Sequence, residues 1–318
     1  TYFKILYLKR GPMEITLINQ QDEAYAKEKL TQYYEDNLIP AEKKAYLTEL
    51  DHNAGPYMGI ESQSGETHYL MDAASQIATL GLSTEHLQEI SDKTTGRVEV
   101  SLHNGQPSYA IRTDVAYDYI SANAALNSIK EQEFDLFYFG TLAQRSSGSR
   151  QALKELMQQL KFKELFFDCN LRQDFYYREV LEDSLNYASI LKLNDEELPI
   201  ISRMLYKSQM QSQEACRMLA HDFDLKCIIL TAGAEGATVY YEGQRFKVPA
   251  EMIDVADTVG AGDAFSAAFA VNLLAGQSIQ KSLESGNKLG AYVASQNGAL
   301  PSLSPEIKQA CSPKQQFD

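Results

Sequence analysis

A short glycine-rich turn between a candidate strand and a candidate helix suggests chemistry first. Gly260-Ala261-Gly262 has almost no side chains, so its backbone N–H groups stay open to a ligand. The first N–H groups of a helix have no internal partner and lie at the positive end of its dipole, which makes an anion site. Asp263 follows directly, at a place where a bound anion disfavours a carboxylate. The turn therefore suggests a phosphate site with an adjacent proton acceptor, as phosphoryl transfer requires.

The same residues also fit a plain structural turn. A glycine-rich connection from strand to helix needs no ligand, and Asp263 would then serve as the helix N-cap. Because short glycine motifs occur in many unrelated loops, spacing alone leaves the two interpretations open.

Polar residues also follow a short apolar strand predicted at 164–168. Asp168, Asn170 and Arg172 lie where this strand ends. In an open parallel sheet, ligands bind beyond the carboxyl ends of the strands. These side chains therefore suit the binding of hydroxyls or phosphates, although Asp168 and Arg172 could instead pair with each other.

A second strand end carries Asn194 and Glu197. They follow the strand predicted at 188–193 and open the next helix. Asn194 as N-cap and Glu197 three residues later form the pattern of a capping box, which needs no ligand. The same placement would let both side chains hold metal-bound water, and spacing does not separate these alternatives.

A third strand end is rich in glycine. The strand predicted at 226–231 ends at Thr231, which is followed by Gly233 and Gly236. Two glycines three residues apart beside a hydroxyl allow the backbone to approach a phosphate closely, although a bare turn has the same pattern.

These motifs lie on an alternating strand–helix pattern, which is typical of α/β proteins with a parallel, doubly wound sheet. Helices are predicted at 117–132, 149–160, 264–274 and 279–297, and a further strand at 134–140. An Asn-Gly turn between alternating segments predicts a β-hairpin at 97–113.

The composition argues against several classes of partner. The chain has 318 residues and a net charge of −14 without a long basic run, which disfavours nucleic acids and anionic membranes. No apolar run approaches the ~20 residues of a membrane-spanning helix. The four cysteines show neither CxxC nor metal spacing, which indicates a reducing, cytoplasmic setting. With this negative charge, a polyphosphate ligand would require a divalent cation.

Taken in order, the motifs of residues 81–304 resemble those of the ribokinase-like (PfkB) carbohydrate kinases. The run Asp257-Thr-Val-Gly-Ala-Gly-Asp-Ala-Phe265 is similar to the second signature of that family. Other similar segments are 191–198 (the Asn-x-x-Glu segment), 230–236 (the nucleotide loop), and 139–145 and 168–172 (the fructokinase branch). No G-x-x-x-x-G-K-[ST] loop occurs, which disfavours a P-loop kinase. The resemblance implies a ribokinase-like three-layer αβα fold with a mostly parallel, doubly wound sheet and a small, incomplete β lid.

The resemblance also implies a reaction, the phosphorylation of a sugar hydroxyl with ATP and Mg²⁺. Asp263 would be the general base. The N–H groups of Gly260, Ala261 and Gly262 would hold the transferring phosphoryl group, and Glu197 would bind Mg²⁺ through water. The residues implied for ATP are Asn194, Thr231, Gly233, Gly236 and Asn287.

Two further sets of residues follow from the resemblance. On the sugar side it implies Asp263 together with Asn170 and Arg172. The family often binds a monovalent cation such as K⁺, and the matching positions are Asp257, Val259, Val293, Gly298 and Ser302. Because lid strands often mediate dimers in this family, a homodimer is one expected form.

Residues 1–80 depart from the family. The chain contains no Gly-Gly pair, so the Gly-Gly-x-x-x-Asn segment that binds sugar in the family is missing. Residues 55–62 and 69–80 instead resemble the start of a class III PLP-dependent aminotransferase, but its catalytic body does not follow, so transamination is not predicted. We therefore expect an atypical segment at 1–80 and a ribokinase-like, ATP-dependent kinase domain at 81–318, with a lid hairpin near 97–113.

Two functions stay open from the sequence. One is an ATP-dependent, fructokinase-like carbohydrate kinase that acts on a small-molecule sugar. The other is a nucleotide-binding but catalytically impaired kinase-like protein that lacks a complete sugar site. The residues that usually select the sugar lie in the unmatched segment, so the sequence does not name it.

Overall fold

The computed structural model describes residues 59–61, 66–69, 87–94, 96, 98–103, 106–129 and 132–313. The chain divides into two compact units, one within residues 11–119 and one that contains residues 120–318. The predicted boundary near residue 80 and most of the atypical segment 1–80 lie outside the described residues. All the site residues singled out from the sequence belong to the second unit.

The first unit contains a four-stranded antiparallel sheet in the order β1-β2-β3-β4. Its strands are β1 (Gly59–Glu61), β2 (Glu66–Tyr69), β3 (Val98–His103) and β4 (Gln106–Ile111). β3 and β4 pair from Val98↔Ile111 to His103↔Gln106, so two residues connect them. The hairpin predicted from the Asn-Gly turn is thus confirmed.

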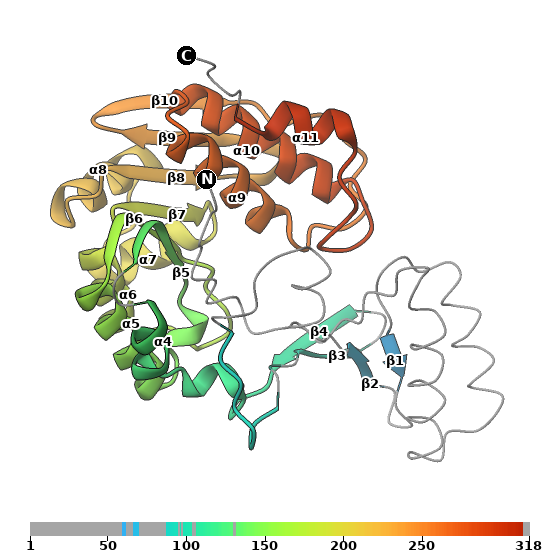
Figure 1. The fold of residues 1–318 in the computed structure, drawn as a ribbon. Helices are drawn as coiled ribbons and strands as arrows, with labels where there is room; N and C mark the ends of the chain where they lie inside the picture. The colour runs from blue at the N-terminus through green and yellow to red at the C-terminus, as the bar shows by residue number, and fades with distance from the viewer. Residues whose placement is uncertain are drawn as a thin grey trace. The chain divides into compact units, whose positions relative to one another are not determined.

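The second unit is built on a six-stranded sheet in the order β10-β9-β8-β7-β6-β5 (Figure 1). Its strands are β5 (Glu133–Phe139), β6 (Lys161–Asp168), β7 (Ile190–Asn194), β8 (Cys227–Thr231), β9 (Ala237–Tyr241) and β10 (Gln244–Val248). β5 to β8 pair in parallel, whereas β9 is antiparallel to both of its neighbours. The predicted mostly parallel α/β sheet is confirmed.

Helices lie on both sides of this sheet (Figure 1). They are α4 (Ala122–Ile129), α5 (Ser147–Gln159), α6 (Arg178–Tyr187), α7 (Glu197–Tyr206), α8 (Ser212–Asp222), α9 (Ala261–Leu274), α10 (Ile279–Ala294) and α11 (Pro305–Cys311). The helix predicted at 117–132 is interrupted, because a 3-10 turn at Ala116–Tyr119 precedes α4. No helix in the described part of the chain has the length and apolar character needed to cross a membrane.

Both faces of the sheet are buried because alternate side chains of each strand enter different hydrophobic clusters. Phe167 and Leu191 pack with residues of α4 to α8. Their sequence neighbours Phe166 and Ile190 pack on the other face with Phe265 of α9 and with α10. The strands therefore read as continuous apolar runs, and the result is a three-layer αβα architecture.

α9 and α10 approach each other closely through two glycines of α10. A Cβ atom at Gly286 would lie 3.0 Å from the carbonyl oxygen of Phe265, and one at Gly290 would lie 3.1 Å from that of Ala261. Residues 261 and 265 belong to the first turns of α9, so these contacts fix the helix at its amino-terminal end. That end carries the glycine turn with Asp263.

The four cysteines of the chain are distributed over the second unit and form no disulfide. Cys169, Cys216, Cys227 and Cys311 are all buried. Burial raises the pKa of the Cys216 thiol to about 12 and that of Cys169 well above its usual range. Asn272 of α9 donates to the carbonyl oxygen of Cys311 over 2.7 Å, which ties α11 to α9.

Candidate active site

The glycine turn that begins α9 is held against the loop after α10. Gly260 is the N-cap of α9 and has a left-handed backbone with φ 83°. A Cβ atom there would lie 2.5 Å from the carbonyl oxygen of Ala299, closer than two such atoms can approach. Both the positive φ and the close contact therefore require glycine at this position.

Two of the three N–H groups in this turn have no hydrogen-bond acceptor within the described part of the chain. The N–H of Ala261 donates to the carbonyl oxygen of Thr258 over 3.3 Å. Those of Gly260 and Gly262 have no acceptor among the residues that the structure describes. Unpaired N–H groups at a helix start are suited to an anion. An anion at this turn would thus depend mainly on Gly260 and Gly262.

Asp263 is the third residue of α9 and is partly exposed. The N-cap position belongs to Gly260, so the sequence alternative in which Asp263 caps the helix does not describe its place. An acid in the first turn interacts favourably with the helix dipole as long as no anion is bound there. A carboxylate that follows two unpaired N–H groups in the chain is suited to act as a general base for an acceptor hydroxyl.

The loop after β6 departs from ordinary backbone geometry at two positions. Asn170 and Gln173 have φ angles of 43° and 47°, which are sparsely populated for residues other than glycine. Arg172 lies between them and donates to the carbonyl oxygen of Leu171 (3.2 Å) and to Asn170 Oδ1 (3.4 Å). Strain of this kind collects at functional sites, where the surrounding structure holds it.

Asp168 is bound by three side chains, with Lys192 of the neighbouring strand as its ion-pair partner. The two carboxylate oxygens lie 3.0 and 3.2 Å from Lys192 Nζ. Oδ2 also accepts from the hydroxyls of Ser266 (3.0 Å) and Tyr138 (2.5 Å). In the sequence, pairing of Asp168 with Arg172 is one of two open alternatives, and Lys192 is not indicated as a partner. Register explains the difference, because Asp168 and Lys192 are directly opposite each other in the parallel ladder.

Glu197 joins two strand-end loops. Its Oε2 accepts from the backbone N–H of Asn194 (2.9 Å), and Asn194 Oδ1 accepts from that of Glu197 (2.8 Å), so the predicted capping box is present. Its Oε1 accepts from the N–H of Leu171 over 2.8 Å. Glu197 as a whole is 6% exposed. It therefore fixes the end of β7 relative to the loop of Asn170 and Arg172.

The same carboxylate suits a water-mediated contact with Mg²⁺. Mg²⁺ usually keeps several waters and takes few protein carboxylates beside the phosphates of a substrate. Each oxygen of Glu197 accepts one N–H and retains a further lone pair. In the described ranges, no three His, Cys, Asp or Glu side chains gather into a cation cage. These donors fit a cation held largely by a nucleotide.

The loop after β8 is shaped by its glycines. Gly233 and Gly236 have φ angles of 45° and 86°; Gly233 begins the 3-10 turn Gly233–Glu235, and Gly236 follows it. A Cβ atom at Gly236 would lie 2.1 Å from the carbonyl oxygen of Val248, so this loop touches the end of β10 directly. Thr231 closes β8, and its hydroxyl lies 3.5 Å from the carbonyl oxygen of Leu193.

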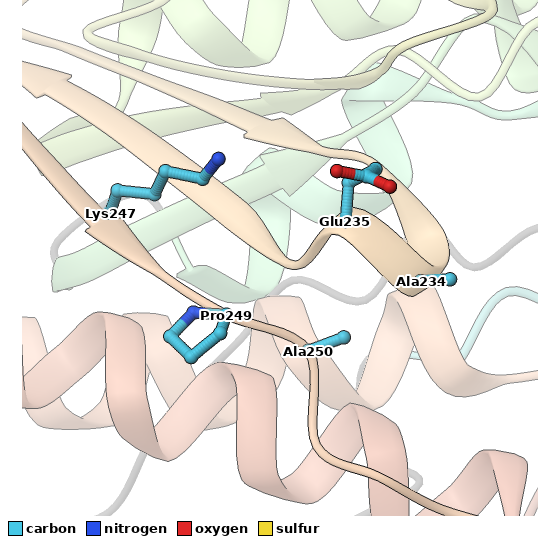
Figure 2. A pocket seen from close by; sticks show the side chains of 5 residues that line it. All are labelled: Ala234, Glu235, Lys247, Pro249 and Ala250. Carbon is cyan, nitrogen blue, oxygen red and sulfur yellow. The ribbon is translucent and has the colours of Figure 1, made fainter.

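A pocket of about 460 Å³ opens between this loop and the end of β10 (Figure 2). It is lined by Ala234, Glu235, Lys247, Pro249 and Ala250. Asn287 borders it indirectly, because its amide donates to the carbonyl oxygen of Pro249 over 3.0 Å.

None of the five residues that line this pocket is among the site residues predicted from the sequence. The direction of β10 would have indicated them. Two antiparallel pairings return β10 to the direction of β8, so residues 247–250 lie at the edge where β5 to β8 end.

The residues that the resemblance implies for a monovalent cation lie on three segments that contact one another. The backbone N–H groups of Ala256 and Asp257 donate to the carbonyl oxygen of Ala294, next to Val293 at the end of α10. Asp257 Oδ1 accepts from the N–H of Val259 (2.9 Å). The carbonyl oxygen of Ser302 accepts from Tyr292 (2.8 Å), which leaves it one lone pair for a cation. Gly298 has φ 86° in the connecting loop.

These features define a class of protein. The chain has a mostly parallel sheet covered on both faces, with a helix start and glycine loops at its carboxyl edge. Solved structures with this arrangement place it among α/β proteins of the ribokinase-like fold. The model of the pfkB carbohydrate kinase family matches residues 69–306. The chain belongs to the PfkB family.

Curated relatives are similar at low identity. A Pyrococcus horikoshii protein named as a sugar kinase is 29% identical over 209 residues, which cover 63% of this chain and 62% of that protein. Fructokinase of Escherichia coli is 24% identical over 241 residues, or 71% of this chain and 76% of the relative. The chain thus spans under two thirds of the length of the first of these.

Solved structures share the fold. Aminoimidazole riboside kinase from Salmonella enterica, in complex with its riboside and an ATP analogue, aligns with a TM-score of 0.63 at 23% identity, covering 75% of this chain and 80% of that one. Fructokinase with bound ATP from Xylella fastidiosa aligns with a TM-score of 0.64 at 18% identity, covering 76% and 77%.

Proposed function

We propose that this protein transfers the γ-phosphoryl group of ATP to a sugar hydroxyl, as a fructokinase-like carbohydrate kinase. The observation that carries the proposal is the start of α9, where the open N–H groups of Gly260 and Gly262 adjoin Asp263. Anion-binding N–H groups beside an acid suit phosphoryl transfer, in which positioning and charge stabilisation supply most of the catalysis. Membership of the PfkB family and fructokinase relatives support a sugar as the acceptor.

In this reaction Asp263 accepts the proton of the sugar hydroxyl while the hydroxyl oxygen attacks the γ-phosphorus and ADP leaves. The N–H groups of Gly260 and Gly262, with a smaller contribution from Ala261, stabilise the charge on the transferring group. Mg²⁺, when bound, neutralises charge on the phosphates. Glu197 would hold that ion through water, while its Oε1 accepts from the N–H of Leu171 and keeps that loop in place.

The remaining assignments follow the same edge of the sheet. The phosphates and ribose of ATP would be held by Asn194, Thr231, Gly233 and Gly236, and the adenine would lie in the pocket bordered by Asn287. Asn170 and Arg172 would face the sugar. A monovalent cation such as K⁺ would bind near the carbonyl groups of Val259, Val293, Gly298 and Ser302 and near Asp257. We also propose a homodimer and a reducing, cytoplasmic setting, which suits four free thiols.

A second candidate is a nucleotide-binding protein with impaired catalysis. The observation that favours it is the extent of the family match, which begins at residue 69. Sugar-binding elements that the family carries near its start have no counterpart in residues 1–80 of this sequence. Such a protein would bind ATP but transfer no phosphoryl group to any sugar.

One assay separates the two candidates. The purified full chain is given ATP, Mg²⁺ and a panel of ketohexoses and pentoses, and ADP release is measured beside calorimetric titration with ATP. Turnover that depends on one sugar supports the kinase. ATP binding without turnover on any sugar would establish the impaired protein and contradict the first proposal.

A further inference from the structure

A buried ion pair lies directly beneath the turn that begins α9. The side chains of Lys192 on β7 and Asp168 at the end of β6 are only 5% and 1% exposed. Removing two charges from water is costly, and well-packed apolar residues often stabilise a core as well or better. Stability alone is therefore a weak reason for this pair, and its surroundings point to another.

The pair is connected to the first two turns of α9. The Ser266 hydroxyl lies 3.0 Å from Asp168 Oδ2 and 2.9 Å from the carbonyl oxygen of Gly262, so its one proton is shared between them. A Cβ atom on Gly262 would lie 3.6 Å from Lys192 Nζ. The ammonium group thus lies beside the α-carbon of Gly262, whose N–H is open to an anion.

The orientation of the pair matches the polarity of the helix. Lys192 lies beside Gly262 in the first turn, whereas the Asp168 carboxylate is bonded to Ser266, one turn further along α9. The positive end of the pair and the positive end of the helix dipole are therefore on the same side. In a buried setting, fixed charges act more strongly than they do in water.

We propose that Lys192 is a positioning residue for phosphoryl transfer. It holds the Gly262 turn through Asp168 and Ser266, and it adds positive charge beneath the site of the transferring group. This inference rests on the proposed function, because it assigns Lys192 to that same site. Lys192 should stabilise the transition state more than it strengthens the binding of ATP, because the charge on the transferring group has to be held in one place there.

A second ion pair on the same sheet supplies a matched control. Lys226 pairs with Glu164 of β6, and Glu164 Oε2 accepts from the Ser189 hydroxyl over 2.7 Å. Like the pair of Lys192 and Asp168 with Ser266, this second pair consists of one acid and one lysine with a serine hydroxyl bound to the acid. Lys226 directly precedes β8, so about 16 Å of extended strand separates it from the edge that carries the site.

The test compares Lys192→Met, the double variant Lys192→Met/Asp168→Asn, and the control Lys226→Met in the full chain. The double variant is included because the single one leaves a buried carboxylate without its lysine and can fail to fold. We expect kcat of the folded double variant to fall at least tenfold while KM for ATP changes less than threefold. Lys226→Met should keep kcat within twofold.

A second measurement does not need turnover. Affinity for ADP with aluminium fluoride, which mimics the transferring phosphoryl group, is compared with affinity for ADP alone by calorimetry. We expect the double variant to lose at least tenfold in the first and to keep the second.

A folded double variant with unchanged kcat, or with unchanged aluminium fluoride affinity, would overturn the inference. Absence of turnover in the unaltered chain, together with a tenfold loss of aluminium fluoride affinity in the double variant, would instead contradict the proposed function and support only the part of the inference that places the charge of Lys192 beneath a bound phosphoryl group.

Discussion

The two ends of the six-stranded sheet carry nearly the same side chains in different settings. β6 bears Glu164 and Asp168 on one face, four residues apart, and each accepts hydrogen bonds from a lysine and a serine. At the carboxyl end the side chains of Lys192 and Asp168 are 5% and 1% exposed. At the other end those of Lys226 and Glu164 are 39% and 12% exposed. Burial, and not composition, distinguishes the pair near the site.

Two glycine turns at the carboxyl end differ in a similar way from one at the amino end. At the amino end, the β9–β10 hairpin contains Gly243 with φ 78°, and a Cβ atom there would meet nothing within 4 Å. At the carboxyl end, Gly236 and Gly260 have similar φ angles but lie against neighbouring backbone. An open turn only reverses the chain. A turn enclosed by backbone fixes where its N–H groups point, and this suggests that the carboxyl end is built to hold a ligand in one place.

The largest effect is expected from Asp263→Asn at the carboxyl end. Loss of the general base should reduce turnover by about 10²- to 10⁴-fold, because proton transfer from the acceptor hydroxyl contributes this much. The affinity for ATP should stay nearly constant, because the proposed role of this carboxylate concerns the acceptor hydroxyl and not the nucleotide. Steady-state kinetics and calorimetry measure both.

Asp254→Asn is the control for this change, because Asp254 is an exposed carboxylate in the loop ahead of the same turn. Equal losses in the two variants would mean that negative charge, and not a base at residue 263, matters for turnover.

The next largest effect is expected from alanine at Gly236, whose turn is enclosed by backbone, in comparison with alanine at Gly243, whose turn is open. Gly236→Ala places a Cβ atom 2.1 Å from the carbonyl oxygen of Val248, so the loop has to shift. Gly243→Ala has a similar φ but open space, and should cost only about 1–2 kcal/mol for the left-handed backbone. We expect Gly236→Ala to lose more free energy of unfolding and also to weaken ATP binding. Urea denaturation and calorimetry test this, and identical losses in both variants would remove the distinction between the turns.

The smallest effect is expected at the amino end, from Lys226→Met. This partly exposed pair should contribute about 0–1 kcal/mol to the free energy of unfolding. The hydrogen bond with Glu164 raises the pKa of Lys226 above its ordinary value of 10.5. Its contribution is therefore full at neutral pH and is lost as the pH rises beyond 10.5 through the raised pKa. Denaturation at pH 7 and above pH 11 should show the difference shrink, and a constant difference would contradict the assignment to this pair.

Much of the fold follows from local patterns in the sequence. Apolar runs such as 226–231 predict the buried strands, because both faces of a parallel sheet are covered. Asn194 and Glu197 predict their own capping box, because all of its contacts lie within four residues.

The missed contacts depend on register between distant segments. Lys192 meets Asp168 only because β6 and β7 pair at that offset. The pocket at Lys247 and Pro249 depends on two hairpins that reverse the chain. The N–H of Ala261 donates to Thr258, so only two of the three N–H groups in the glycine turn lack an acceptor within the described residues. This bond depends on the turn at Gly260, which packs against Ala299, a residue distant in the sequence.

The buried thiols give the second unit internal reporters of its own opening. Cys169 follows β6, Cys216 lies on α8, Cys227 begins β8 and Cys311 ends α11. Burial raises the pKa of each, so almost no thiolate is present at neutral pH and an alkylating reagent has to wait for local unfolding. The labelling rate of each cysteine therefore measures how fast the helix or strand that surrounds it becomes exposed. Comparing Cys311 with Cys227 would tell whether the C-terminal helix detaches before the sheet separates.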